Sequence, residues 1–136
     1  MKIVIYANVD KDWRDRIRTP YGMAQFRSYI SRSFITSNQP YNHPSSRAMA
    51  GDIIVWAFRE KHTWYFLGDG YVSEKWKDDE DEDWEFLIEA ARLYPRSVLL
   101  DELSFADRVK KSLNIGYDMK WSEYKQLLEK AGEPIV

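Results

Sequence analysis

The feature that most constrains the fold is a pair of apolar segments, residues 50–58 and 63–72, separated by four polar residues. The first, Ala-Gly-Asp-Ile-Ile-Val-Trp-Ala-Phe, begins with a Gly-Asp turn and continues with β-branched and aromatic residues. The second, Thr-Trp-Tyr-Phe-Leu-Gly-Asp-Gly-Tyr-Val, is aromatic and is broken by two glycines. Short apolar runs with turn residues between them are typical of a β-hairpin. We therefore predict a hairpin over residues 51–74, with Trp56 and Trp64 near its tip.

Patterns elsewhere in the chain predict further strands and helices around this hairpin. Apolar β-branched runs indicate strands, and apolar residues spaced three or four apart indicate helices. Strands are expected over 2–7, central in the sheet, and over 96–101, and helices over 23–35, 84–91, 104–113 and 121–131. Residues 36–46, with two prolines, two asparagines and three serines, form a loop of a length that favours a binding role. The mixture predicts one α+β domain, residues 1–136, built on a small, mixed, partly closed β-barrel flanked by helices.

Cysteine is absent from the chain, which excludes disulfides, thiolate zinc sites and thiol nucleophiles. This fits an intracellular protein, and we expect a cytoplasmic location. No apolar run approaches the roughly 18 to 20 residues of a membrane span, so no membrane partner is expected.

The six consecutive acids at 78–83 lack the alternating spacing and the turn glycine of a calcium loop, and they fit a solvated turn before a helix. Neither a metal nor a cofactor is expected.

The two halves of the chain differ in charge. Residues 1–62 hold ten Lys and Arg against five Asp and Glu, a net +5, whereas residues 63–136 hold ten against seventeen, a net −7. Most cations of the first half are arginines, whose planar forked donors suit phosphate and whose faces stack on rings. This pattern favours nucleic acid as a partner, with ordinary scatter of surface charge as the alternative.

Recognisable catalytic motifs are missing from the sequence. His43 and His62 are the two histidines, and neither has a Ser, a Cys or a carboxylate at a known motif spacing. A nuclease of the Asp and Glu-x-Lys type would need Glu-x-Lys soon after Asp52, where the chain has Glu-Lys at residues 60–61. The Gly-Asp-Gly of residues 68–70 lacks the third glycine and the helix of a dinucleotide-binding loop. We therefore expect a protein that is not an enzyme.

An ordered set of motifs in the chain resembles a known family. The set comprises a first strand ending in Tyr-Ala-Asn at 6–8, Trp13, an arginine-bearing helix at 27–34, a basic loop, Gly-Asp-Ile-Ile-Val-Trp at 51–56 and Gly-x-Gly-x-Val at 68–72. This order resembles the PUA-like superfamily and, within it, the EVE and YTH branches. The resemblance covers residues 1–75 and the strand at 96–101, and residues 78–94 look like an insertion.

The resemblance implies a domain that binds nucleic acid and holds a modified base, such as a methylated one, in an aromatic pocket beside the first strand. Flipping a base out of a duplex costs a few kcal/mol, and stacking on aromatic rings can offset this at about 1–3 kcal/mol per base. The expected base-binding residues are Tyr6, Asn8, Trp13, Trp56 and Trp64, with Trp13 and Trp56 as walls and Asn8 on the base edge. The expected phosphate-binding residues are Arg27, Ser31, Arg32, Ser33 and Arg47.

Core packing is the alternative role for Trp56, and we expect Trp76, Trp84 and Trp121 to lie in the core.

Some domains of the family that this chain resembles form the N-terminal specificity module of McrB-type modification-dependent restriction GTPases. The expected partner is thus DNA rather than RNA, with a C-terminal GTPase domain in the native chain. Two alternatives stay open: a stand-alone RNA-binding PUA-like domain, and a protein-interaction module whose acidic run, residues 78–83, docks a basic partner.

Overall fold

The computed structural model describes residues 1–9, 16, 19–30, 33–36, 48–60, 62–77, 84–112 and 117–133 of the chain. For residues 7–9, 23, 27–30, 33–36, 60, 77, 84 and 85 the description covers the backbone. The elements are β1 (Ile3–Val9), α2 (Pro20–Ile30), β2 (Ser33–Thr36), β3 (Ile53–Glu60), β4 (Thr63–Lys77), β5 (Trp84–Leu99), the 3-10 turn η1 (Leu100–Glu102), α4 (Ala106–Ser112) and α5 (Trp121–Ala131).

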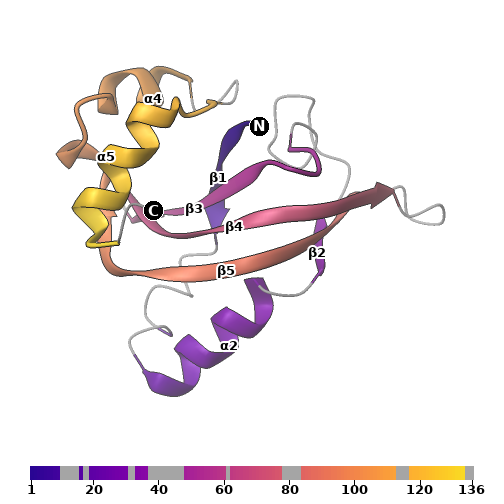
Figure 1. Cartoon of the computed structure of the whole chain (residues 1–136). Helices are drawn as coiled ribbons and strands as arrows, with labels where there is room; N and C mark the ends of the chain where they lie inside the picture. The colour runs from indigo at the N-terminus through magenta and orange to yellow at the C-terminus, as the bar shows by residue number, and fades with distance from the viewer. Residues whose placement is uncertain are drawn as a thin grey trace.

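The fold is α+β, built on one mixed five-stranded sheet with the strand order β1-β3-β4-β5-β2. Strand β1 runs parallel to β3, and the other neighbouring pairs are antiparallel. The described strands form an open sheet with β1 and β2 at its two edges, as Figure 1 shows. The predicted partly closed barrel is therefore not confirmed. The first strand, predicted to be central, is an edge strand whose outer side is covered by a bridge from Val4 to Asp118.

Helices cover the two faces of the sheet, α4 and α5 on one face and α2 on the other (Figure 1). Successive residues of β1 show the alternation, because Ile3 and Ile5 pack with α5 whereas Val4 packs with Phe26 of α2. We call these two faces the α5 side and the α2 side. Because both faces are covered, the sheet has a core on each side, and the apolar residues of β1 and β3 are buried in near-continuous runs.

The predicted hairpin is confirmed by β3 and β4, which pair from Ile53 opposite Tyr71 to Glu60 opposite Thr63. The Gly-Asp turn before β3 has a physical reason in the structure. Gly51 has a φ of 96°, and its N–H donates to the carbonyl oxygen of Val72 over 2.7 Å. The buried Asp52 carboxylate accepts the backbone N–H groups of Lys2 and Met49 at 2.8 Å each. This turn therefore fixes the start of β1 against the start of β3.

The helix predicted over 84–91 is wrong, because these residues form the first half of β5. Phe86 and Ile88 are 0% and 1% exposed and lie on the α2 side, while Glu89 is exposed. The alternation ends at Ala90, which has a φ of 51° and lies where the register with β4 shifts. The bulge makes the apolar spacing look helical, which explains the error. Whether residues 78–94 are an insertion relative to a family stays a prediction.

The helix predicted over 23–35 is two elements, α2 and then β2. Helix α2 begins earlier than predicted because the Thr19 hydroxyl accepts the N–H of Gly22 over 3.0 Å and Pro20 takes the first helical position. The predictions of a strand near 96–101 and of helices near 104–113 and 121–131 are confirmed by β5, α4 and α5. Helix α5 ends at Gly132, whose φ is 78°.

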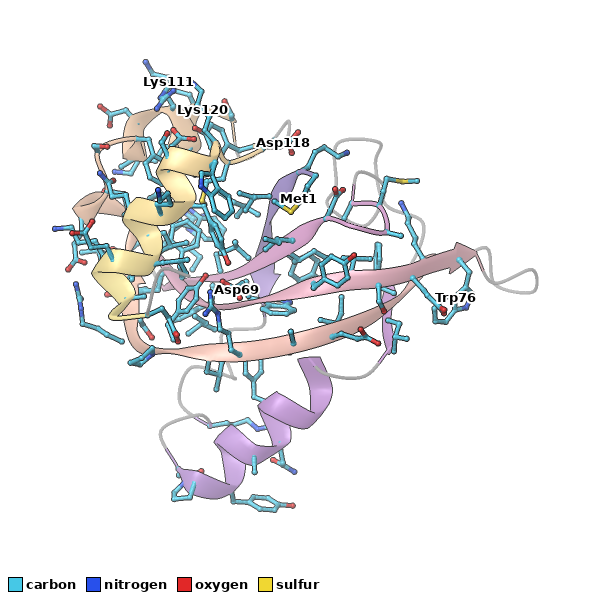
Figure 2. All side chains as sticks on the ribbon, in the orientation of Figure 1. Met1, Asp69, Trp76, Lys111, Asp118 and Lys120 are labelled. Atoms are coloured by element: carbon cyan, nitrogen blue, oxygen red, sulfur yellow. The ribbon has the colours of Figure 1, made fainter. Side chains whose placement is uncertain are left out.

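Two tryptophans predicted for the core are exposed, Trp76 by 38% and Trp121 by 51%. Trp76 lies at the end of β4 that is remote from α5 (Figure 2). Only the backbone of Trp84 is described, and the predicted loop and acidic run lie outside the described residues apart from Thr36.

The two glycines of the second hairpin strand are explained by close packing. A Cβ on Gly68 would lie 2.1 Å from the carbonyl oxygen of Arg92, and one on Gly70 would lie 2.6 Å from the Trp56 ring. A side chain at either position would therefore push β4 away from β5 or displace the largest fully buried side chain of the core.

We expect Gly68→Ala to lower the free energy of unfolding by about 1–3 kcal/mol, because the added methyl group meets backbone rather than a movable side chain. Urea unfolding followed by circular dichroism measures the change. Glu74→Ala, an exposed position on the same strand, is the control and should change stability by no more than about 0.5 kcal/mol. Equal midpoints for parent and Gly68→Ala would show that β5 does not pack this closely on β4.

Candidate functional site

The structure brings two of the predicted base-binding residues together in the middle of neighbouring strands. Tyr6 of β1 is the register partner of Trp56 on the parallel strand β3, and both side chains lie on the α2 side. Tyr6 is half-buried, whereas Trp56 is 2% exposed. The Trp56 indole thus packs in the core, which is the alternative that the sequence left open. A ring this buried offers no face for stacking in this arrangement.

An aromatic surface nevertheless exists around Trp56. We define it by Tyr6, Trp56, Phe58 and Tyr65, which all belong to the α2-side core. The rings of Phe58 and Tyr65 are stacked, with centroids 5.1 Å apart and planes inclined by 14°. Tyr6 and Tyr65 lie on either side of β3 and are half-buried, whereas Trp56 and Phe58 are buried, and we call the two tyrosines the rim of this surface. The surface is apolar at its base and carries two phenol groups at its edge.

The other predicted base-binding residues are not placed in this surface. Trp64 lies on the opposite, α5 side of the hairpin, with the Arg59 guanidinium 5.9 Å from its ring centroid. Trp56 and Trp64 therefore cannot hold one base between them. The backbone of Asn8 lies in β1, beyond Tyr6, where the register with β3 shifts. Trp13 lies outside the described residues.

The predicted phosphate-binding residues are described only in part. Arg27 belongs to α2 and Ser33 to β2, both as backbone, while Ser31, Arg32 and Arg47 lie outside the described residues. Helix α2 packs on the α2 side through Phe26, which is 0% exposed. The helix that carries Arg27 thus covers the same face of the sheet as the aromatic surface.

A buried polar network around Asp69 was not predicted. Asp69 is 4% exposed, and its carboxylate faces α5 (Figure 2). Its Oδ2 accepts the hydroxyls of Tyr94 and Tyr124 at 2.7 Å each. The Arg92 guanidinium donates to Oδ1 over 2.9 Å and to Oδ2 over 3.3 Å. Arg92 also donates to Glu133 over 3.3 Å, so the network joins β4, β5 and the chain beyond α5.

The network shifts the pKa values of its members. Burial raises the pKa of the Tyr94 hydroxyl well above its usual value, and the Asp69 charge raises it further. Burial and the same charge raise the pKa of Tyr124. Burial alone would lower the pKa of Arg92, but its hydrogen bonds to Asp69 and the charge of Asp69 outweigh burial and raise it. Every group is partnered, so the network is a structural link between the sheet and α5. Its sequence signal was an Asp inside an apolar strand.

A second buried carboxylate, Glu123, holds the other end of α5. It accepts the Tyr117 hydroxyl at 2.9 and 2.8 Å, the Lys120 backbone N–H at 2.8 Å and the Arg108 guanidinium. Partial burial and then the Glu123 hydrogen bond raise the pKa of Tyr117 to about 12. The carboxylate thus caps the helix and ties it to α4.

Among the described residues, no three His, Cys, Asp or Glu side chains come together in a way that could hold a metal ion. None of the described helices is both long enough and apolar enough to cross a bilayer.

Comparisons of this chain with protein-family models, with curated proteins and with solved structures give no match. The PUA-like resemblance therefore stays a prediction that rests on the order of the motifs.

Proposed function

We propose that this chain is a non-catalytic nucleic-acid-binding domain whose preferred ligand is DNA that carries a modified, methylated base. The observation that carries the proposal is the aromatic surface, in which half-buried Tyr6 and Tyr65 flank buried Trp56 and Phe58. A nucleobase stacks on aromatic rings, and its phosphates bind arginine. The partly exposed tyrosines and the arginine-bearing helix α2 lie on the same face of the sheet and suit these two contacts. The net +5 charge of residues 1–62 supports the same assignment.

The physical account of recognition uses the rim of the aromatic surface. A flipped base stacks on the rings of Tyr6 or Tyr65, and stacking of this kind is worth about 1–3 kcal/mol per base. The amide of Asn8, two residues after Tyr6 in the sequence, can both donate to and accept from a base edge. A methyl group on the base adds roughly 1 kcal/mol when it is buried against apolar rings. Arg27, Arg32 and Arg47 supply contacts to phosphate.

The relation to the PUA-like superfamily, and to the N-terminal module of McrB-type restriction GTPases, is the finer part of the proposal. It is supported by the ordered motifs and by a mixed sheet in which the strand after the Gly-Asp turn pairs with β1. In this proposal the native protein uses the domain to direct a GTPase to modified DNA.

Tyr6→Leu and Tyr65→Leu test the proposal, because leucine keeps apolar volume and removes the ring. Each variant should raise the dissociation constant for a methylated duplex by about 5- to 150-fold, equivalent to the 1–3 kcal/mol of one stacked base. Fluorescence anisotropy at fixed salt measures binding to duplexes that differ only in methylation. The matched control is Tyr71→Leu, an exposed tyrosine on the α5 side of the sheet, which should bind like the parent.

The same titrations separate the alternatives. Equal affinity for all duplexes, with a steep loss of binding as salt rises, would leave a non-specific binder and remove the reader function. Tighter binding to RNA of matched sequence would favour the stand-alone RNA-binding domain. Absence of binding to any oligonucleotide would contradict the proposal, as would Leu variants that bind like the parent.

A further inference from the structure

The sheet carries a second exposed surface, on the opposite face from the aromatic surface. It lies where β4 and β5 extend past the Asp69 network, and it includes Tyr71, 42% exposed, and Trp76, 38% exposed. Glu74, between them on β4, and Glu89, directly across from Tyr71 on β5, are exposed as well. We call these four residues the acidic aromatic surface. Figure 2 places Trp76 at the far end of the sheet from α5.

Strand pairing places these side chains on one side of the ladder. Tyr71 pairs with Ile53, which packs on the α5-side core, so Tyr71 lies on the α5 side. After the register shift, Glu74 pairs with Leu87, and Trp76 follows two residues later on the same side.

Lys75 lies between Tyr71 and Trp76 on β4, but its side chain is on the other face of the sheet. Lys75 points to the α2 side, with its ammonium group 5.5 Å from the ring centroid of Phe86. Two carboxylates and two aromatic rings are therefore exposed together on the α5 side, with the neighbouring lysine turned away from them.

We propose that the acidic aromatic surface binds an extended, basic peptide segment of a partner protein. Charge complementarity selects this occupant, because carboxylates attract Lys and Arg while Trp and Tyr faces attract the same cations through their π systems. The bulge between Val72 and Glu74 puts Tyr71 and Trp76 on one side of the sheet, opposite Glu89 and Glu85 of β5. These partners are four residues apart, about 13 Å of strand, which matches two cations four residues apart on one face of an extended peptide. The surface repels phosphate, so nucleic acid on the α2 side and a peptide here do not compete.

The experiment uses the full chain and a labelled eight-residue peptide with arginines at its second and sixth positions in a Gly-Ser background, which places both on one face of the extended peptide. Matched peptides carry glutamates or glutamines at those positions. Backbone amide shifts in a ¹⁵N-labelled sample should change on β4 and β5 around Tyr71, Trp76 and Glu89 with the arginine peptide alone. Equal shifts with the glutamine peptide, or shifts confined to other elements, would overturn the proposal.

Two variants assign the binding to the surface. Glu74→Gln with Glu89→Gln should weaken binding of the arginine peptide by about fivefold or more, as should Tyr71→Leu with Trp76→Leu. The Glu variant changes only exposed groups, so it keeps the test valid even if the aromatic variant unfolds. Asp107→Asn with Glu129→Gln removes the same charge from exposed positions on α4 and α5, and it should leave affinity within about twofold of the parent.

A further variant separates this surface from the acidic run in the sequence. Replacing the six acids at 78–83 by their amides should leave the arginine peptide bound with shifts at the same positions. If that variant loses binding while the Glu74 and Glu89 variant keeps it, the run alone binds the peptide and the proposal fails. Failure here leaves the nucleic-acid proposal intact, because the ligands of the two tests differ and Tyr71→Leu serves only as a control in the DNA titration.

Discussion

Replacing Asp69 by Ala is expected to lower the free energy of unfolding by about 3–5 kcal/mol. It leaves the hydroxyls of the buried residues Tyr94 and Tyr124 without this acceptor, at about 1–3 kcal/mol for each unsatisfied group, and it removes an ion pair to the partly exposed Arg92. The carboxylate is 4% exposed and accepts four hydrogen bonds, two from Arg92 and one each from Tyr94 and Tyr124. Its loss removes the acceptor that the two tyrosine hydroxyls share, while Arg92 keeps its hydrogen bonds to Glu133 and to the Tyr124 hydroxyl. Because a domain of this size is stable by only about 5–15 kcal/mol, the variant should lose a large part of its stability.

A graded series tests the reason for this effect. Tyr94→Phe removes one hydrogen bond to a charged acceptor and should cost about 1.5–3 kcal/mol, less than Asp69→Ala. Glu102→Gln breaks the exposed pair with Arg96, whose atoms lie 2.8 Å apart, and should cost less than about 1 kcal/mol. Urea unfolding gives all three values. Asp69→Ala as stable as Glu102→Gln would mean that the network does not hold α5 on the sheet.

Sequence patterns identified the elements whose signals are local. The hairpin of β3 and β4 has β-branched and aromatic residues in runs closed by turn residues, and α5 has a helical period closed by Gly132. In both cases the residues that decide the structure lie within one short window, so the pattern and the fold agree.

The elements that were missed depend on partners far away in sequence. The first half of β5, residues 84–91, is predicted as a helix because the bulge at Ala90 and the apolar spacing around it imitate a 3.6-residue period. Strand β2 was assigned to the preceding helix, although Ser33–Thr36 pairs with residues 84–87 of β5, about 50 positions later. A four-residue strand of this kind is stabilised by its neighbour rather than by its own composition.

The site shows the same division between local and non-local information. The sequence placed aromatic residues near the end of β1 and β3, and the structure gathers Tyr6 and Trp56 there as register partners. Which ring is accessible depended on packing: Trp56 is buried under Gly70, while Tyr65, which was not predicted, reaches the rim. The alternation of β4 also separates Trp64 from Trp56, which a list of conspicuous tryptophans does not reveal.

The second large effect is expected at alkaline pH. Burial and buried carboxylates raise the pKa values of Tyr94, Tyr117 and Tyr124 above the value of 10 that tyrosine has in an unfolded chain. The stability that these hydroxyls contribute is fully present below pH 10 and is lost as the pH rises toward the higher folded values, about 12 for Tyr117. In that window the unfolded chain releases protons that the folded chain keeps, so the equilibrium moves toward unfolding.

The size of the effect follows from the number of tyrosines. Each contributes a slope of up to about 1.4 kcal/mol per pH unit, so the three together give at most about 4 kcal/mol per unit above pH 10. Urea unfolding at a series of pH values measures the slope, and Tyr124→Phe should reduce it by about one third while lowering stability at neutral pH. Phenolate absorbance of the folded protein provides an independent check. Constant stability from pH 9 to 11, with all tyrosines titrating near pH 10, would show that Asp69 and Glu123 do not hold these hydroxyls. The packing of α5 on the sheet through them would then be wrong, because a hydroxyl donated to a buried carboxylate cannot ionise at the pKa of a solvated one.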